Sequence, residues 1–381
     1  MRVCLVNSFF PPWRGGAETY TYNLAKQLVK RKHDVQVFCA APPRQPGSYN
    51  AEGIQLNALH VKTWLYGTPI TTKLPWKLLI ADADLIHAGF PSPYNAFSAS
   101  LASWLKRTPS ILTWHNDLPP VTATARLLVG MHDRLVLPTY IRTFKRIIST
   151  SRSYAESSRI LREYAEKVRI VLNGVDGEKF HPNLKPNPIR QRLGDAKIIL
   201  FVGSLSKWHS YKGLDVLINA FASANKLRRG IALLVVGDGS LKPTYQKLAS
   251  ELHLADKVVF AGNVSDEDLP SYYAASDLLV LPSKDRSEGF GLTILEANAC
   301  AKPVIGSNVG GIPDVIHHEY NGLLVPPNSP EALSTAIIRL VENDSLRSEM
   351  GRNGRRFAEE HSWSEVAEAT ERIYLEALRK F

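Results

Sequence analysis

The chain has 381 residues and a formal net charge of +10, and 44% of its residues are hydrophobic. That length is too great for one ordinary hydrophobic core and predicts two domains. No apolar run reaches the roughly 18 residues that a membrane-spanning helix needs, which argues against an integral membrane protein.

The first half of the chain alternates short apolar strands with longer helical stretches. Strands are predicted over residues 2–7, 34–39, 84–87 and 110–113, and helices over 16–32 and 96–106. Such alternation is typical of βαβ units and a parallel sheet. We therefore expect a first α/β domain over residues 1–180.

The alternation stops after Phe180, where three prolines and two asparagines within nine residues predict a linker over 181–190. It resumes with strands over 197–202, 232–236, 258–260, 278–281 and 303–306, and with helices over 214–224, 242–252, 266–274 and 331–340. A second α/β domain is expected over 191–362. The last stretch, 363–379, is predicted to be helical.

Cysteine usage and the first residues bear on the compartment. Cys4, Cys39 and Cys300 are odd in number and widely spaced, so they form neither a disulfide framework nor a metal cluster. Residues 1–7 lead directly into a strand pattern, without the pattern of a cleavable signal. A reducing cytoplasm is the expected location.

Two carboxylates, Glu288 and Glu296, stand eight positions apart around Gly289 and Gly291. Residues 293–299 have a helical composition, so the glycines lie in a loop that leads into a helix. Such a helix start presents free N–H groups and a partial positive charge, which suit a phosphate. Eight residues exceed two helical turns, so we expect the carboxylates to bind two ends of one ligand. A nucleotide sugar is such a ligand, because it has hydroxyls at both ends and phosphates between them. The alternative is that Glu288 lies in a solvated loop and Glu296 on a surface helix.

This segment resembles the E-x7-E signature of retaining GT-B-fold glycosyltransferases, the group 1 or family 4 enzymes that include sucrose synthases and phosphatidylinositol mannosyltransferases. The resemblance extends from Pro11 to Val325. It implies an α/β architecture of two Rossmann-like domains facing a central cleft, with the acceptor on the first domain and the donor on the second. It also implies that helix 363–381 packs back on the first domain.

The resemblance implies further donor contacts. Gly15 and Gly16 follow the first strand, and family members use this turn to contact the donor. His115, at another strand end, corresponds to a contact of the transferred sugar, and Asn173, in an Asn-Gly-Val-Asp turn, faces the donor. As residues alone, a structural histidine and ordinary turns account for these positions equally well.

The second domain is expected to neutralise the leaving diphosphate with cations. Family members place an arginine where this chain has Ser204. Lys212 matches the family lysine, and Lys207 is a candidate replacement for the arginine, although a lysine gives weaker geometric control than an arginine fork. By resemblance, the backbone of Val264 contacts the base. The phosphates are contacted by Gly289, Phe290, Gly291 and Leu292. Glu288 binds the sugar hydroxyls, and Glu296 binds the ribose.

No cofactor and no metal are expected, only a nucleoside-diphosphate sugar as donor substrate. Asp82-Ala83-Asp84 spells the Asp-x-Asp of metal-dependent glycosyltransferases. Here the motif precedes a predicted strand instead of following one, so strand-entry carboxylates are the better interpretation.

The positive charge is concentrated in residues 1–180, which hold 23 Lys and Arg against 12 Asp and Glu. Its densest part runs from Arg126 to Arg169, where Arg142, Lys145, Arg146 and Arg152 interleave with apolar residues. Two interpretations remain open, a solvated helix face and a surface for anionic lipid headgroups or a polyanionic acceptor. Nucleic acid is not expected, because no recognition motif accompanies the charge.

The sequence thus predicts a retaining, metal-independent hexosyltransferase that acts on a lipid-linked or glycan acceptor hydroxyl, in the cytoplasm and peripherally on the membrane. A GT-B-like nucleotide-sugar epimerase and a non-catalytic sugar-nucleotide-binding subunit are the alternatives. The base, the sugar, the acceptor, the linkage and the oligomeric state stay open.

Overall fold

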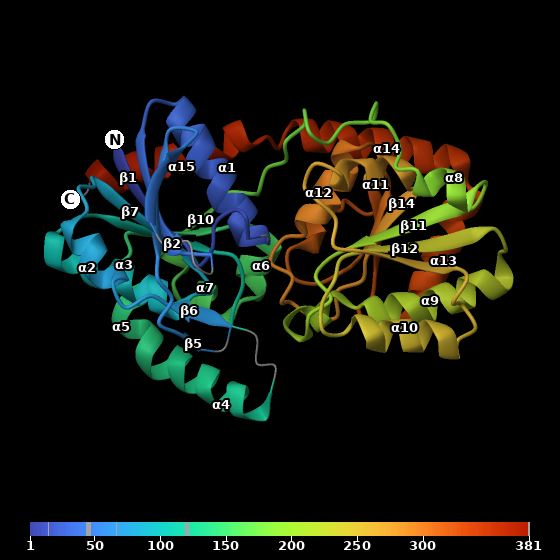
Figure 1. Ribbon diagram of the computed structural model, residues 1–381, viewed down its shortest axis with the longest axis horizontal. Coiled ribbons are helices and arrows are strands. Elements are labelled where there is room, and N and C mark those ends of the chain that lie inside the picture. The colour runs from blue at the N-terminus through green and yellow to red at the C-terminus, as the bar shows by residue number, and fades with distance from the viewer. Residues whose placement is uncertain (14, 43–46, 66, 119–121, 380–381) are drawn as a thin grey trace. The chain divides into compact units, whose positions relative to one another are not determined.

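The computed structural model describes residues 1–381 except 14, 43–46, 66, 119–121 and 380–381. By its internal contacts the chain divides into two units. Unit 1 comprises Met1–Asn173 and Trp363–Phe381, and unit 2 comprises Gly174–Ser362. Each unit is an α/β layer structure with its own sheet (Figure 1).

The boundary between the units differs from the sequence prediction of a first domain to residue 180 and a linker over 181–190. Residues 174–190 belong to unit 2. Phe180 is buried and contacts Tyr273 edge-on, with ring centroids 5.6 Å apart, and the backbone N–H of Asn187 donates to Ser271 O at 2.9 Å. The segment therefore packs on unit 2 and is not a free linker.

The sheet of unit 1 has eight strands in the order β10-β9-β8-β7-β1-β2-β4-β3. Strand β3 is antiparallel to β4, and the other pairings of this sheet are parallel. A separate hairpin, β5–β6, is antiparallel. The strands are β1 (Arg2–Val6), β2 (Asp34–Ala40), β3 (Gly47–Ala51), β4 (Ile54–Leu59), β5 (Thr63–Leu65), β6 (Thr68–Ile70), β7 (Leu85–Phe90), β8 (Ser110–Trp114), β9 (Arg146–Ser149) and β10 (Val168–Ile170).

Helices cover both faces of this sheet, with α1 and α15 on one side and α2, α3 and α5 on the other (Figure 1). The bounds are α1 (Gly16–Lys30), α2 (Leu74–Ile80), α3 (Pro93–Lys106), α4 (Ala123–Met131), the π-helical η1 (His132–Val136), α5 (Leu137–Ile141), α6 (Arg152–Ser157), α7 (Arg159–Glu163), the 3₁₀ turn η2 (Ala165–Lys167) and α15 (Trp363–Arg379).

The sheet of unit 2 has six parallel strands in the order β13-β12-β11-β14-β15-β16. Its central strands are continuous apolar runs because both faces are covered, as in β12, all of whose residues are buried. The strands are β11 (Lys197–Val202), β12 (Ile231–Val236), β13 (Val258–Gly262), β14 (Leu278–Leu281), β15 (Val304–Ser307) and β16 (Gly322–Val325).

Helices α9 and α10 lie on one face of this sheet, and α12 and α14 lie on the other (Figure 1). The bounds are α8 (Ile189–Leu193), η3 (Lys207–Lys212), α9 (Leu214–Leu227), α10 (Lys242–Glu251), α11 (Leu269–Ala275), α12 (Leu292–Ala299), η4 (Ile312–Asp314), α13 (Pro330–Glu342) and α14 (Asp344–Glu359). Turns that follow the carboxyl ends of β11, β12, β13 and β14 carry most of the residues that the sequence singles out.

The last helix, α15, lies beside α1 in unit 1 although more than 300 residues separate them (Figure 1). Glu371 binds both Arg31 Nη2, at 2.5 Å, and His33 Nε2, at 2.8 Å. Deeper in the unit, the Tyr374 hydroxyl is hydrogen-bonded at 2.5 Å to Nδ1 of His87, a buried imidazole whose pKa burial lowers to about 3. The helix therefore completes the core of unit 1.

The basic stretch after Arg126 is not one helix. Residues Arg146–Ser149 form strand β9, with Ile147 and Ile148 buried in the sheet. Arg146 is ion-paired with Glu376 of α15, and Lys167 donates to the carbonyls of Arg142 and Phe144. Part of the predicted basic surface is thus engaged within unit 1.

We expect Tyr374→Phe to destabilise unit 1 by about 1–3 kcal/mol, because it leaves Nδ1 of the buried His87 without its partner. Urea denaturation measures the change. Tyr320→Phe, at a largely exposed tyrosine, is the matched control and should stay within about 0.5 kcal/mol of wild type. Equal loss in both variants would contradict a specific role for the His87 bond.

Candidate functional site

The loop between β14 and α12 in unit 2 holds Glu288 in a buried position, with 7% of the residue exposed. A second loop fixes its backbone, because Gly311 N–H donates to Glu288 O at 2.9 Å. A Cβ at Gly310 would lie 2.1 Å from that same oxygen, and a Cβ at Gly311 would lie 2.2 Å from Gly289 O. Glycine at both positions is therefore required for the close approach of the two loops.

The Glu288 carboxylate forms an ion pair with Lys212, with Nζ and Oε2 2.8 Å apart, and it also accepts from Ser283 Oγ at 3.4 Å. Burial opposes the charge on Lys212, but the neighbouring Glu288 outweighs it and raises the pKa of the ammonium above its usual value. Lys212 ends η3, after β11, so the pair joins the loops that follow two adjacent strands. Sequence reasoning selected both residues but did not predict that they would bind each other.

The turn η3 presents the other predicted cation. Lys207 and Ser204 are both exposed, and Lys207 N–H donates to Ser240 Oγ at 3.2 Å. His209, which sequence reasoning missed, is bonded to Ser206 Oγ at 2.8 Å, and burial together with Lys212 lowers its pKa to about 4. A neutral imidazole therefore lies close to the ion pair at physiological pH. The sequence did not indicate this position of His209, because a lone histidine in a serine-rich turn matches no motif.

Helix α12 begins directly after Gly291, whose φ of +96° is in the left-handed region. Its first hydrogen bonds run from Ile294 and Leu295 N–H to Gly291 O, which leaves the N–H groups of Leu292 and Thr293 without a helical acceptor. The Thr293 hydroxyl is buried and has no hydrogen-bond partner among the described residues. Phe290, also buried, anchors this turn. The arrangement offers donors and a helix N-terminus to an anion.

Glu296 lies one turn into α12 and accepts from the Tyr273 hydroxyl at 2.6 Å. Burial raises the pKa of this carboxyl from 4.5 to about 7, although the Tyr273 bond and Lys179 act in the other direction. The carboxylate is thus partly protonated near neutrality and is not the solvated surface group that the alternative interpretation predicts.

The loop after β12 closely approaches the turn between β11 and η3. A Cβ at Gly237, where φ is +139°, would lie 1.9 Å from Gly203 O, and one at Gly239 would meet the backbone of Leu205. Val264 follows β13 in the same region of the sheet edge and is half-buried. The predicted residues of unit 2 therefore gather at the carboxyl ends of β11–β14, where open α/β sheets bind ligands.

The remaining predicted residues lie in unit 1. Gly15 precedes α1, where the Glu18 carboxylate covers it, since a Cβ at Gly15 would lie 2.3 Å from Glu18 Oε2; Gly16 is the first residue of the helix. His115 follows β8 and contacts Tyr20 edge-on, with centroids 5.0 Å apart.

Two of these predicted residues carry a buried polar atom without a hydrogen-bond partner. His115 Nε2 and Asn173 Oδ1 have no partner among the described residues. Burial lowers the pKa of His115 to about 4, so its ring is neutral. Atoms of this kind are costly to leave unpaired and are typical of ligand contacts.

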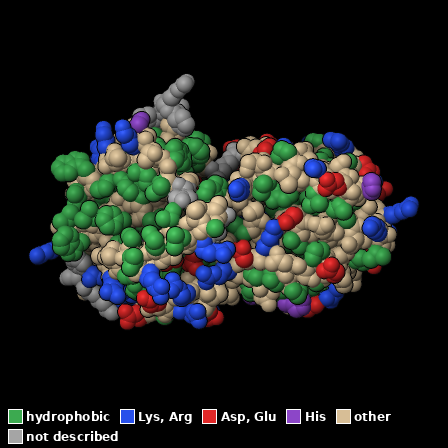
Figure 2. Space-filling model, turned by 90° about the horizontal axis from the view of Figure 1, so that it is seen from below, with side chains coloured by type: hydrophobic (Ala, Val, Ile, Leu, Met, Phe, Trp, Pro, Cys, Tyr) green, Lys and Arg blue, Asp and Glu red, His purple; other side chains and the backbone are tan. Residues whose placement is uncertain are grey.

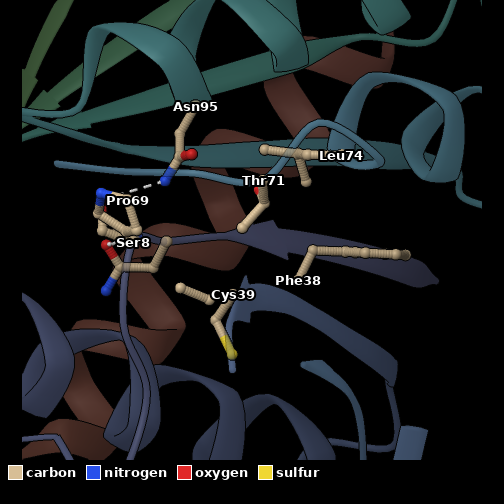
Figure 3. Close-up of a pocket in the computed structure, with 9 residues that line it drawn as sticks. Ser8, Phe38, Cys39, Pro69, Thr71, Leu74 and Asn95 are labelled. Carbon is tan, nitrogen blue, oxygen red and sulfur yellow. Dashed lines mark hydrogen bonds between the residues drawn. The ribbon is translucent and has the colours of Figure 1, made fainter. Parts of the chain in front are cut away.

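A crevice of about 170 Å³ opens at the carboxyl ends of β1 and β2, where Asn95 Nδ2 donates to Ser8 Oγ at 3.2 Å (Figure 3). Figure 3 shows Cys39, Pro69, Thr71 and Leu74 around it. It leaves no room for a water-sized sphere, so it is not a small-molecule pocket. It marks where hairpin β5–β6 packs beside the loop that follows β1.

Asp82 and Asp84 have a structural partner. Both carboxylates bind the Arg2 guanidinium, Asp84 with Oδ1 at 2.6 Å from Nη2, and Asp84 also accepts from Arg2 N–H at 2.8 Å. They therefore fix the start of β1 beside β7. In the part of the chain that the structure describes, no group of three or more His, Cys, Asp or Glu is placed to hold a metal ion.

Comparison with known proteins agrees with this arrangement. Residues 187–357 match the model of "Glycosyl transferases group 1", and residues 14–179 match that of "Glycosyltransferase Family 4". The D-inositol 3-phosphate glycosyltransferase of Streptomyces bingchenggensis is 33% identical over 96% of this chain and 86% of its own length. The chain belongs to the group 1 glycosyltransferases. The D-rhamnosyltransferase WbpZ of Pseudomonas aeruginosa is also 33% identical, over 72% of this chain and 68% of its own.

The glycosyltransferase also resembles solved structures along its whole length. HepE from Anabaena, in a complex with UDP, has a TM-score of 0.76 and 21% identity, and the match covers 99% of this chain and 100% of that one. This similarity shows that the two units together have the GT-B fold.

The raised pKa of Glu296 predicts a pH-dependent stability. The folded protein retains a proton that the unfolded chain loses above about 4.5, so the contribution of Glu296 to the free energy of unfolding should fall as pH rises from about 4.5 to about 7. The buried His87, His115 and His209, whose pKa values are lowered, act in the opposite direction in wild type and variant alike. Glu296→Gln should remove this loss, and its advantage over wild type should grow by roughly 1–3 kcal/mol across that range. Denaturation at several pH values measures it, with Glu251→Gln, at an exposed glutamate, as control. A constant difference between Glu296→Gln and wild type would contradict the shift.

Proposed function

We propose that this glycosyltransferase transfers a hexose from a nucleoside-diphosphate sugar to an acceptor hydroxyl with retention of configuration. The observation that carries the proposal is the buried Glu288–Lys212 pair beside the free N-terminus of α12. A carboxylate for sugar hydroxyls, an ammonium and unpaired N–H groups are the groups that a sugar diphosphate requires. The UDP bound by HepE, which shares the fold, supports the same class of donor.

In this proposal the residues of unit 2 bind the donor. The N–H groups of the Gly289–Leu292 turn and Lys207 stabilise the diphosphate, and Glu296 binds the ribose hydroxyls through its deprotonated form. Ser204 and the backbone of Val264 contact the nucleotide. Glu288 orients the hexose, and Lys212, held by Glu288, places its positive charge where the leaving oxygen gains negative charge.

The residues of unit 1 contact the sugar and acceptor. His115, which burial keeps neutral, is proposed to hydrogen-bond the transferred hexose through the unpartnered Nε2. The Asn173 amide and the backbone at Gly15 and Gly16 are proposed as further donor contacts. With the anomeric carbon in an oxocarbenium-like state, the acceptor proton passes to the leaving phosphate, and cations of the chain take the role of a metal ion.

We expect Glu288→Gln to lower kcat by at least about 100-fold, because it removes a charge that acts mainly in the transition state. Glu296→Ala should mainly raise the donor KM. The measurement is nucleoside-diphosphate release in EDTA from UDP-, GDP- and ADP-hexoses, after thermal-shift screening of the three nucleotides. Glu251→Ala serves as the exposed control.

Other results would contradict the proposal in distinguishable ways. Wild-type kinetics for a folded Glu288→Gln variant would show that the ion pair has no catalytic role. Formation of an epimeric donor without acceptor would indicate an epimerase, and nucleotide binding without turnover would indicate a binding subunit. Strict dependence on manganese or magnesium would exclude the metal-independent mechanism.

We also propose a cytoplasmic enzyme that acts on a lipid-linked acceptor at an anionic membrane surface. Cys4, Cys39 and Cys300 are free and buried, as suits a reducing compartment. Among the described helices none is long and apolar enough to cross a membrane.

The surface that favours attachment is an apolar face on α3, α4 and η1, over which apolar side chains gather in Figure 2. Its exposed members are Phe97, Trp104, Leu105, Leu127, Leu128, Met131, Leu135 and Val136. Tyr140 joins the helices, since its ring contacts Phe97 and its hydroxyl is bonded to His132 Nε2 at 2.9 Å. Exposed apolar groups of this size are typical of interaction surfaces.

Charge favours an anionic bilayer for this face. Residues 93–136, from the start of α3 to the end of η1, contain Lys106, Arg107, Arg126 and Arg134 but only two carboxylates, Asp117 and Asp133. Asp117 binds Trp114 and Ser158 within unit 1, and Asp133 is hydrogen-bonded to His132. Lysine or arginine near an anionic bilayer contributes about 1 kcal/mol each, and tryptophan suits the interface. Arg126 and Arg134 are the exposed cations of α4 and η1. Arg146, which the sequence analysis included in the basic surface, is ion-paired with Glu376.

We expect wild type to co-sediment with phosphatidylglycerol vesicles at low salt and less at high salt. Leu127→Glu with Leu135→Glu should abolish this binding, and Arg126→Glu with Arg134→Glu should weaken it, without a change in nucleotide affinity. Leu227→Glu, at a leucine 77% exposed in unit 2, is the matched control. A wild-type protein that stays in the supernatant at both salt concentrations would show that the acceptor is reached without membrane attachment.

A further inference from the structure

Three aromatic rings lie together in unit 1 beside the turn that contains Gly15. Phe9 and Trp13 belong to the loop after β1, and Trp64 belongs to hairpin β5–β6. The ring centroids of Phe9 and Trp64 are 5.9 Å apart in a stacked arrangement, and those of Phe9 and Trp13 are 5.1 Å apart and tilted. Neither the family signature nor the proposed donor contacts assign these residues a role.

The hairpin is held in place by its packing. Trp64 pairs directly with Pro69 across β5 and β6, so both side chains lie on one face of the hairpin. Pro69 lies against Ser8 in the crevice at the end of β1 (Figure 3). The same face therefore brings Trp64 onto Phe9 and fixes the cluster at the carboxyl edge of the sheet, the edge at which open α/β sheets bind ligands.

Packing alone does not account for two features of the cluster. Trp64 remains 53% exposed although one face of its ring stacks on Phe9. Trp13 Nε1 is buried and, within the described part of the chain, has no hydrogen-bond acceptor. An aromatic face open to solvent and an unpaired indole donor are together suited to a ligand that has an apolar face and a polar rim.

We propose that Phe9, Trp13 and Trp64 form a platform on which a pyranose ring of the acceptor stacks. The C–H groups on one side of a pyranose carry a small positive charge that matches the negative face of an indole, and the hydroxyls at its edge accept a hydrogen bond from Trp13 Nε1. The acceptor of the glycosyltransferase is accordingly a carbohydrate, either free or at the end of a lipid-linked glycan. This inference rests on the proposed function.

The test titrates the full-length protein with the methyl α-glycosides of mannose, rhamnose, glucose and galactose by calorimetry. At least one glycoside should bind wild type, and its dissociation constant should rise about tenfold in Trp64→Ala, equivalent to about 1.4 kcal/mol. Trp64→Phe, which keeps an aromatic face, should retain most of the affinity. Trp76→Ala, at a tryptophan of α2 that is 64% exposed, is the matched control and should bind the glycoside as wild type does.

A second titration, with UDP, GDP and ADP, separates the platform from the donor site. The nucleotide that binds should have the same affinity for wild type and Trp64→Ala. A loss of nucleotide affinity in place of glycoside affinity would mean that the rings stack on the base and would overturn the proposal. So would unchanged glycoside affinity in Trp64→Ala, the absence of glycoside binding by wild type, or a Trp64→Ala effect confined to vesicle binding.

The failure of the proposed function has a different signature. Glycoside binding that depends on Trp64, with no binding of any of the three nucleotides, would leave the platform in place and remove the donor site. The melting temperature of Trp64→Ala in the absence of ligand distinguishes a ligand contact from a structural role. A ligand contact leaves it near that of wild type.

Discussion

The ion pair between Glu288 and Lys212 fixes the arrangement of the loops at the carboxyl ends of β11 and β14 in unit 2. Two buried charges are tolerated only as a bonded pair, since removing one partner leaves the other uncompensated at a cost of about 3–5 kcal/mol. The pair ties the turn after β11 to the loop after β14. Glycine is required at the tightest backbone contacts of these loops, as at Gly213, where a Cβ would lie 2.0 Å from Pro282 O. The pair therefore holds these two loops together at the carboxyl edge of the sheet.

In unit 1 the buried polar side chains of β7 and β8 and of the turn after β8 are neutral. His87 and His115 are both buried imidazoles of lowered pKa, and His87 Nε2 is bonded to Thr113 at 2.6 Å. Thr113 is also hydrogen-bonded to Tyr20, whose ring contacts His115. His87, Thr113 and Tyr20 are thus hydrogen-bonded to one another, whereas His115 Nε2 lacks a partner within the described residues.

The sequence predicted the α/β class and most strands because continuous apolar runs between helices are typical of parallel strands buried on both faces. It selected Glu288 and Glu296 from their spacing and Lys212 from the family resemblance, and their roles stay predictions. It missed the hairpin β5–β6, since Thr63–Leu65 and Thr68–Ile70 are too short to show alternation. The position of His209 beside the ion pair, the Arg2 partner of Asp82 and the boundary at Asn173 all depend on contacts between distant residues, which no local pattern encodes.

The return of α15 to unit 1 makes unit 2 an insertion within unit 1 in the order of the chain. On the ribosome, the residues of unit 2 are all synthesised before Trp363–Arg379, so unit 2 has its full sequence first, although domains usually fold in order from the N-terminus. Until α15 emerges, His87 lacks Tyr374 and Arg146 lacks Glu376. Nascent chains that stop before residue 363 should consequently contain a protected unit 2 and a protease-sensitive unit 1.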